Sequence, residues 1–451
     1  MPGSSEDGQP PADGARRVGV IVALVGAGAL VVLGLALVPW SPVPGGAPDP
    51  VSVSSIFTAA EIARAEDYAR VARPLGWSSL AVSLLVSLLV GFSGWGRRLV
   101  ARLPGPWWGQ VLLGTVLVLL LGRLATLPFA LASRELRLRN DLTRQPLGGF
   151  VRDLAVSFAV TWVVTALALL VLLACARRWR RAWPGVAGAV LAVAALGASY
   201  GYPVVVEPLF NDFQSLPDGS LRTEILALAA REGVAVDEVL VADASRRTTT
   251  LNAYVSGFGA TRRVVVYDTL VESLPQDQAL SVVAHELAHA RHADVLVGSM
   301  LGAAGLLTGV GLLAALAAVL LRGRRGREGP AVGHPQAIPR LLALVALATL
   351  LVSPVQSAIS RAIETRADVD ALAATRDGPA MEALQRELAL RSLADPTPPR
   401  WSSLWFATHP TVLERVALAR ACCPTAGAAS RAPWRVAFVT PRRGSEWAGR
   451  G

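Results

Sequence analysis

The segment "SVVAHELAHARHAD", residues 281 to 294, contains three histidines and a glutamate at spacings that can bind a metal ion. His285 and His289 are four residues apart, so a helix places them one turn apart on one face, where both imidazoles can reach one zinc ion. Glu286 directly follows the first histidine and can meet a metal-bound water without binding the metal. The five-residue pattern also occurs by chance in unrelated helices, as two solvated histidines and a surface glutamate.

His292, the third histidine of this segment, is a poor third ligand. It lies seven residues after His285, which returns it to nearly the same helical face but about 10.5 Å further along the axis. Ligand atoms around one tetrahedral zinc lie only about 3.3 Å apart. The longer metzincin pattern needs a histidine six residues after the second, where this chain has Val295. We therefore place His292 at the helix end or among the residues that support the ligands.

A third ligand is expected from a second helix, and the segment "SAISRAIETRADVDALAA" offers two carboxylates for it. Glu364 and Asp368 are four residues apart and share one helical face. Glu364 would bind the metal, and Asp368 would orient one of the ligand histidines. Acidic and basic residues at such spacings are also common on solvated helices, so periodicity alone leaves both interpretations open.

The composition indicates a membrane protein. Of 451 residues, 53% are hydrophobic and 17% are charged, and the mean hydropathy is +0.46, which is too apolar for an ordinary soluble domain. Seven segments approach the length that a helix needs to cross about 30 Å of hydrocarbon; a cleaved signal peptide is the alternative for the first. They are residues 18–40, 78–95, 110–131, 154–175, 184–204, 295–321 and 338–356.

The net charge of +10 comes from arginine, since the chain has no lysine. The arginines form short runs between apolar segments, which is typical of membrane topology signals, and we expect no nucleic-acid partner. The side that carries these runs is cytoplasmic by the positive-inside rule, which favours placing the polar region that contains the histidines outside. The integral, multi-pass protein is expected in a bacterial plasma membrane, because its arginine-only, alanine-rich composition suggests a GC-rich genome.

We divide the chain into four parts by composition and hydropathy. A disordered tail (1–17) precedes a membrane domain with five helices (18–205). A metal-binding domain (206–425) includes the last two membrane segments, and a second disordered tail (426–451) follows. Within the third part we predict a helix over 220–233, strands within 237–243, 250–258 and 262–270, a turn at 257–261 and helices over 357–425.

Several ordered motifs are similar to those of one family. The chain resembles the CAAX prenyl protease 1 family of integral-membrane zinc metallopeptidases, over roughly residues 55 to 420. The matching stretches are "FTAAEIARAEDYARVARPLGW", "PLFNDFQSLPDGSLRTEI", "LNAYVSGFGATRRVVVYDTL", "VVAHELAHARHADV", "SRAIETRADVDALA" and "FATHPTVLERV". The resemblance implies a mainly helical protein, with seven transmembrane helices enclosing a chamber and a small α+β zinc domain.

The resemblance also implies roles for individual residues. One zinc ion per chain would be held by His285, His289 and Glu364, with Glu286 as the general base and Asp368 as the supporting acid. Asn252 would hold the substrate backbone, and His409 and Arg415 would contact the substrate carbonyl or the developing oxyanion. Without the family, His409 is explained as a histidine before Pro410 at a helix start, and Arg415 as an ion pair with Glu414.

The expected activity is hydrolysis of peptide bonds by a zinc-activated water, with membrane-associated or CAAX-like peptides as substrates and the lipid bilayer as surroundings. One alternative is a site-2 type intramembrane protease, in which the HExxH motif lies within a membrane helix and an aspartate supplies the third ligand. The other is a multispan scaffold or transporter with a vestigial metal site.

Overall fold

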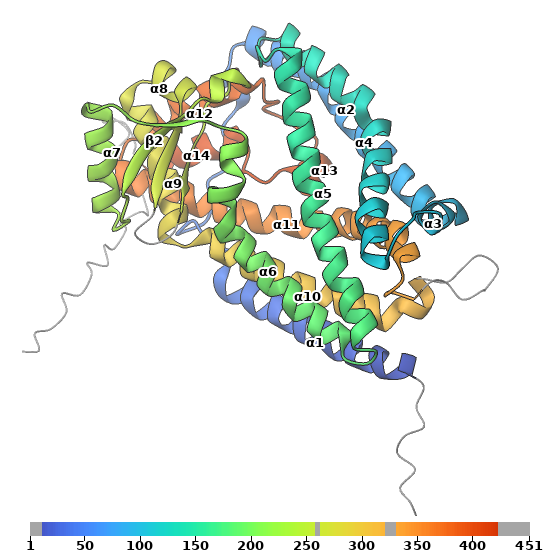
Figure 1. Ribbon diagram of the computed structural model, residues 1–451. Coiled ribbons are helices and arrows are strands. Elements are labelled where there is room, and N and C mark those ends of the chain that lie inside the picture. Colours follow the sequence, from blue (N-terminus) through green and yellow to red (C-terminus); the bar gives the residue numbers. More distant parts are fainter. Residues whose placement is uncertain (1–10, 258–261, 321–330, 423–451) are drawn as a thin grey trace, which may run out of the picture.

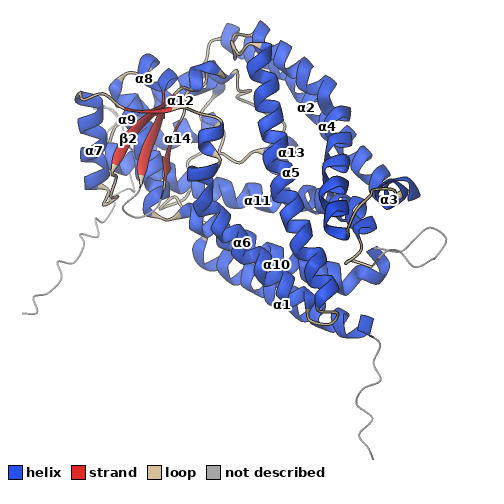
Figure 2. Ribbon diagram, viewed as in Figure 1, coloured by secondary structure: helices blue, strands red, loops and turns tan. Residues whose placement is uncertain are grey.

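The computed structural model describes residues 11–257, 262–320 and 331–422, and most of these are helical (Figures 1 and 2). Within them, seven helices are long and apolar enough to cross a membrane, in agreement with the seven predicted segments. The prediction of a multispan, mainly helical protein is thus confirmed. The seven are α1 (Pro11–Leu37), α2 (Ala59–Phe92), α4 (Trp107–Arg139), α5 (Leu147–Arg178), α6 (Trp183–Val205), α10 (Asp294–Leu320) and α11 (Ile338–Thr375).

Several of these helices extend well beyond the segments predicted from hydropathy. Helix α1 begins at Pro11, inside the predicted tail. Helix α2 begins at Ala59, because Thr58 and Glu61 cap its first turn reciprocally. Helix α11 continues from its apolar part to Thr375 without a break. A continuous extension of a membrane helix therefore carries the two carboxylates predicted for the metal site.

Some predicted features lie outside the described residues. They are the first ten residues of the N-terminal tail, the turn at 258–261, most of the arginine-rich loop within 321–330, and the C-terminal tail, within 423–451.

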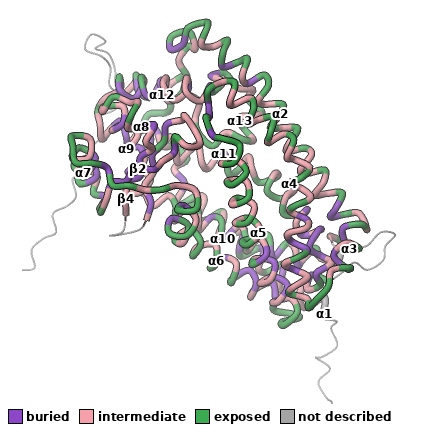
Figure 3. The backbone as a smooth tube through the Cα atoms, turned by 45° about the horizontal axis from the view of Figure 1, so that its top comes forward, coloured by how far each residue is buried: buried purple, intermediate pink, exposed green. Residues whose placement is uncertain are grey.

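The membrane helices contact one another in turn, and five of them (α4, α5, α6, α10 and α11) also share one buried apolar cluster. Contacts pass from α10 to α6, α5, α4, α2 and α11 in turn, and Val297 and Leu301 of α10 reach Ile359 of α11. Helix α1 lies along α10 (Figure 1). Much of the surface of these helices is exposed, whereas buried residues gather around β2, β4 and α9 and at the end of the membrane helices near α3 (Figure 3). Exposed apolar side chains suit helices whose outer surface contacts lipid.

Helices α1 and α10 approach each other closely because glycines lie at their contact. A Cβ atom on Gly311 would lie 2.3 Å from the backbone nitrogen of Ala23, so a larger residue must push the helices apart. We expect Gly311→Ala to lower the free energy of unfolding by about 1–3 kcal/mol, measured as a lower thermal midpoint in detergent. Gly309→Ala on the same helix is the control, since a Cβ there meets nothing within 4 Å. Equal midpoints for the two variants would contradict this packing.

The polar domain is built on a sheet of four short strands in the order β1-β2-β4-β3. Strands β2 and β4 are parallel, and β1 and β3 join them antiparallel at the two edges. Three of the strands were predicted, whereas β1 has only three residues and was missed. The bounds are β1 (Phe213–Ser215), β2 (Glu238–Ala242), β3 (Ala253–Ser256) and β4 (Arg263–Tyr267).

Alternating side chains of β4 determine what covers each face of the sheet. Val264 and Val266 point into a core shared with α7 (Ser220–Arg231) and α9 (Gln276–Arg291), whereas Val265 packs on the opposite face. This core fixes α9 against the sheet. The remaining short helices are α3 (Gly94–Ala101), α8 (Asp268–Ser273), α12 (Gly378–Ser392), α13 (Arg400–Phe406) and α14 (Val412–Cys422), of which the last three lie in the region predicted to be helical.

Candidate metal centre and active site

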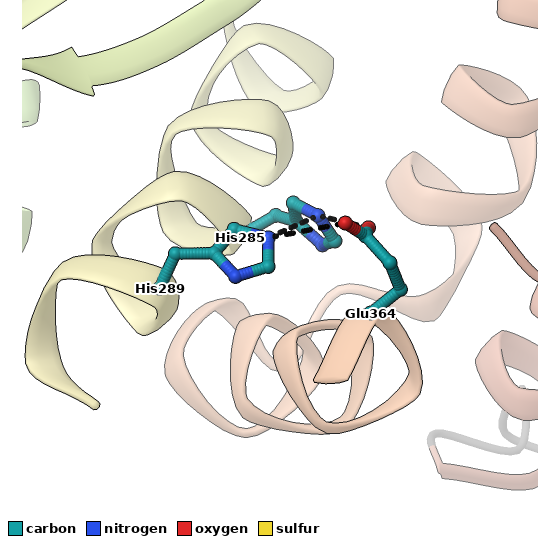
Figure 4. Close-up of side chains that lie close together, drawn as sticks. All are labelled: His285, His289 and Glu364. Atoms are coloured by element: carbon teal, nitrogen blue, oxygen red, sulfur yellow. Dashed lines mark hydrogen bonds and ion pairs between the residues drawn. The ribbon is translucent and has the colours of Figure 1, made fainter. Parts of the chain in front are cut away.

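The packing of α9 turns its two motif histidines toward α11. Val283, Ala284 and Leu287 are buried in the sheet core, so the face with His285 and His289 is directed away from the sheet. Helix α11 packs against α9 there and presents Glu364. Figure 4 shows both imidazoles pointing toward this carboxylate. The structure therefore brings together the three residues predicted as metal ligands.

The ligand atoms of these residues lie at distances that suit one metal ion. Nε2 of His285 is 3.1 Å from Nε2 of His289 and 3.2 Å from Oε2 of Glu364. Nε2 of His289 is 3.7 Å from Oε1 of Glu364. Ligands around a tetrahedral ion with bonds of 2.0–2.1 Å lie about 3.3 Å apart. The spacing and the donor types, two imidazoles and a carboxylate, fit a divalent metal.

The electrostatics of the cluster also favour a cation. Burial opposes protonation of His285, but its contacts with Asp368 and Glu364 outweigh burial and raise its pKa to about 10. The same negative carboxylates would stabilise a metal cation bound to these ligand atoms.

Asp368, predicted to orient a ligand histidine, lies next to His285. Its Oδ1 lies 3.0 Å from Nδ1 of His285, with an angle too bent for a full hydrogen bond, and its side chain is fully buried. Arg415 of α14 donates to both carboxylate oxygens, from Nε at 2.8 Å and from Nη2 at 2.5 Å. The predicted alternative pairing of Arg415 with Glu414 is wrong, because Glu414 accepts instead from the backbone nitrogen of Thr411. Arg415 thus reaches the cluster through Asp368.

Two further predicted residues border the cluster. Burial raises the pKa of the Glu286 carboxyl, although the positive charges of His285 and His289 oppose this rise. His409 lies in the loop before α14, with Nε2 3.3 Å from Oε2 of Glu364, and its side chain is 57% exposed. An imidazole that is both exposed and next to a candidate ligand can contact a molecule that enters the site.

Asn252 lies at the start of the edge strand that runs beside α9. It is exposed, and its side-chain oxygen accepts a hydrogen bond from the backbone nitrogen of Ala253 at 3.0 Å. Strand β3 pairs with β4 on one side and contacts α9. No strand among the described residues pairs with its other side. An extended chain could therefore add to the sheet beside the metal cluster.

His292 is kept apart from the cluster, as the helix-rise argument predicted. It caps the C-terminal end of α9, and its Nε2 lies 2.8 Å from Oδ2 of Asp370. Sequence reasoning missed Asp294, whose Oδ2 lies 2.9 Å from Nδ1 of His289. On a continuous helix these two residues would be about 140° apart around the axis, so periodicity gave no signal for their contact.

Two adjoining parts of the chain match the models of known protein families. Residues 47–212 match the family model "CAAX prenyl protease N-terminal, five membrane helices", and residues 215–422 match the model of peptidase family M48. The metalloprotease YhfN of Bacillus subtilis is 28% identical over 377 residues, which are 80% of this chain and 86% of that protein. The crystal structure of Ste24p from S. mikatae has a TM-score of 0.71 at 20% identity, covering 91% of this chain and 99% of that one, and shows a shared fold.

The matches to CAAX prenyl proteases themselves are shorter. A CAAX prenyl protease 1 homolog of Oryza sativa subsp. japonica is 45% identical over 89 residues, or 20% of this chain and 21% of that protein. CAAX prenyl protease 1 of Saccharomyces cerevisiae is 43% identical over 88 residues, or 19% of each.

Neither predicted alternative is supported. The histidines lie on α9, before the membrane helix α10 begins, and the third residue of the cluster is a glutamate rather than an aspartate, unlike the pattern expected of a site-2 type protease. A scaffold or transporter is not supported either, because the matched M48 family consists of metal-dependent peptidases. The chain is an integral, multi-pass membrane metallopeptidase and belongs to peptidase family M48.

Proposed function

We propose that the chain is a zinc endopeptidase whose ion is held by His285, His289 and Glu364. The observation that carries the proposal is the triangle of ligand atoms on α9 and α11, at distances that suit a tetrahedral ion. Two histidines and a glutamate are a common ligand set of catalytic zinc, and they leave a fourth position for water. Bound zinc lowers the pKa of that water to about 7 and polarises the scissile carbonyl.

Glu286 is the proposed general base. Its carboxylate takes a proton from the attacking water and delivers it to the leaving amine. Burial raises the pKa of this carboxyl, which brings it closer to the neutral range where a proton can be both accepted and released.

The proposed oxyanion contact comes from His409. Its exposed ring lies beside Glu364 and can donate a hydrogen bond to the substrate carbonyl as negative charge develops there. Arg415 was predicted to share this role. The contacts of its guanidinium with Asp368 support a role through that carboxylate, which faces His285.

Strand β3 and Asn252 are proposed to hold the substrate in an extended conformation. An edge strand offers unpaired backbone groups that bind a peptide through main-chain hydrogen bonds, largely independent of its side chains. Because β3 contacts α9, a peptide on this edge would pass beside the metal ligands. Such binding within a chain suits an endopeptidase.

Membrane-associated or CAAX-like peptides are the proposed substrates. The catalytic part is continuous with membrane helices through α10 and α11, and residues 47–212 match the model of the CAAX prenyl protease N-terminal region. Helix α13, which precedes the His409 loop, exposes Trp401, Leu404 and Phe406. These apolar side chains suit a substrate with an apolar terminus or anchor.

The proposal predicts about one zinc ion per chain in the full-length protein purified in detergent. Removing the ion with a chelator should abolish cleavage of a test peptide, and adding zinc should restore it. Metal analysis and peptide hydrolysis measured on the same preparation check both results. Zinc-free, inert protein would contradict the proposal. Comparing protein termini in cells with and without the active enzyme then identifies substrates.

A further inference from the structure

We infer that Asp294 is a positioning residue that holds His289 in the orientation needed to bind the metal. The inference rests on the proposed zinc site and assigns a role to the first residue of the membrane helix α10. Oδ2 of Asp294 lies 2.9 Å from Nδ1 of His289, and Nε2 of the same ring faces His285. One nitrogen of the ring thus meets a carboxylate while the other faces the metal ligands.

This contact fixes the tautomer that metal binding requires. A carboxylate can only accept at Nδ1, so His289 carries its proton there and leaves the lone pair of Nε2 directed at the other ligand atoms. Carboxylates in this position also orient the ring and raise its basicity as a ligand. The side chain of Asp294 is only 9% exposed, so water competes little for the contact.

The interruption between helices α9 and α10 creates the contact of Asp294 with His289. Helix α9 ends at Arg291, His292 caps it, and Ala293 has φ +53° before α10 begins. This left-handed residue turns the chain, so that the carboxylate at the start of α10 reaches back to the last turn of α9. Alanine seldom adopts this left-handed conformation, and here the conformation brings Asp294 to His289.

Arg366 of α11 fixes the other oxygen of the carboxylate, since its Nη2 donates to Oδ1 of Asp294. Asp368 and Arg415 form the same arrangement next to His285, in which an arginine binds the carboxylate that contacts the histidine. Each candidate ligand histidine is therefore backed by a carboxylate, and each carboxylate by an arginine from another element. In the pair formed by Asp294 and Arg366, the aspartate begins α10 and the arginine lies on α11. The site therefore depends on how these two membrane helices pack against each other.

The test is zinc affinity of the full-length protein in detergent, measured with Zn²⁺ in competition with a chelating dye after removal of metal. We expect Asp294→Ala to weaken the Kd for zinc about 10–100-fold, the range typical when an outer partner of a ligand is lost. Asp294→Asn keeps the shape and one acceptor oxygen but loses the charge, and should weaken the Kd about 10-fold, near the lower end of that range. The Asp294→Asn variant also keeps the inference testable if the Asp294→Ala variant does not fold.

Asp370→Ala is the matched control, because it removes an aspartate from a histidine outside the cluster, His292, and should leave the Kd unchanged. Ala293→Gly should also leave it unchanged, since glycine adopts positive φ readily. A folded Asp294→Ala or Asp294→Asn with the Kd of the wild type would overturn the inference alone. Wild-type protein that binds no zinc would instead overturn the proposed function, and this inference with it.

Discussion

Replacing Glu286 with Gln should reduce the rate of peptide cleavage by about 100-fold or more, while zinc stays bound. A positioned general base contributes about 10²–10⁴-fold to a hydrolysis, and the amide cannot take the proton of the attacking water. The ligand atoms belong to other residues, His285, His289 and Glu364, so the metal content should remain that of the wild type. Initial cleavage rates and zinc content, measured on the same detergent-purified protein, check the two halves of this result.

Glu224→Gln is the matched control for this change. Glu224 lies on α7 in the same domain and is exposed, so the same loss of one carboxylate there should leave cleavage unaltered. Two outcomes would contradict the role of Glu286. One is a Gln variant that cleaves at the rate of the wild type, and the other is a variant that has lost its zinc.

Those parts of the site that depend on short-range helix geometry could be predicted from the sequence. The four-residue spacing of His285 and His289 places both rings on one face, and the rise of a helix excludes His292. Both statements agree with the structure. The membrane helices could be predicted because apolar runs of sufficient length have few alternatives in a chain of this composition.

Features that depend on tertiary contacts could not be predicted in this way. The charged extension of α11 beyond its apolar part carries no hydropathy signal, although it brings Glu364 and Asp368 to α9. The turn at Ala293 is unfavourable for alanine, so local propensity points away from it and from the contact of Asp294 with His289. Arg415 has an acidic neighbour in the sequence but pairs with Asp368, from a different helix.

The largest loss of metal is expected from Glu364→Ala, because it removes the single candidate ligand that comes from α11. The remaining two histidines lie one turn apart on α9 and cannot enclose an ion without it. The Kd for zinc should weaken well beyond the 10–100-fold expected for an outer partner such as Asp294, and cleavage should be lost with the metal. Zinc titration and peptide hydrolysis of the full-length protein measure both effects. Thr365→Ala is the matched control on the same helix, since its hydroxyl donates to the backbone oxygen of Arg361 and to no other group among the described residues. A Glu364→Ala variant that keeps one tightly bound zinc would show that the third ligand lies elsewhere. If the ion is lost, the metal site depends on α11, and therefore forms only when this membrane helix has packed against the helix that carries the histidines.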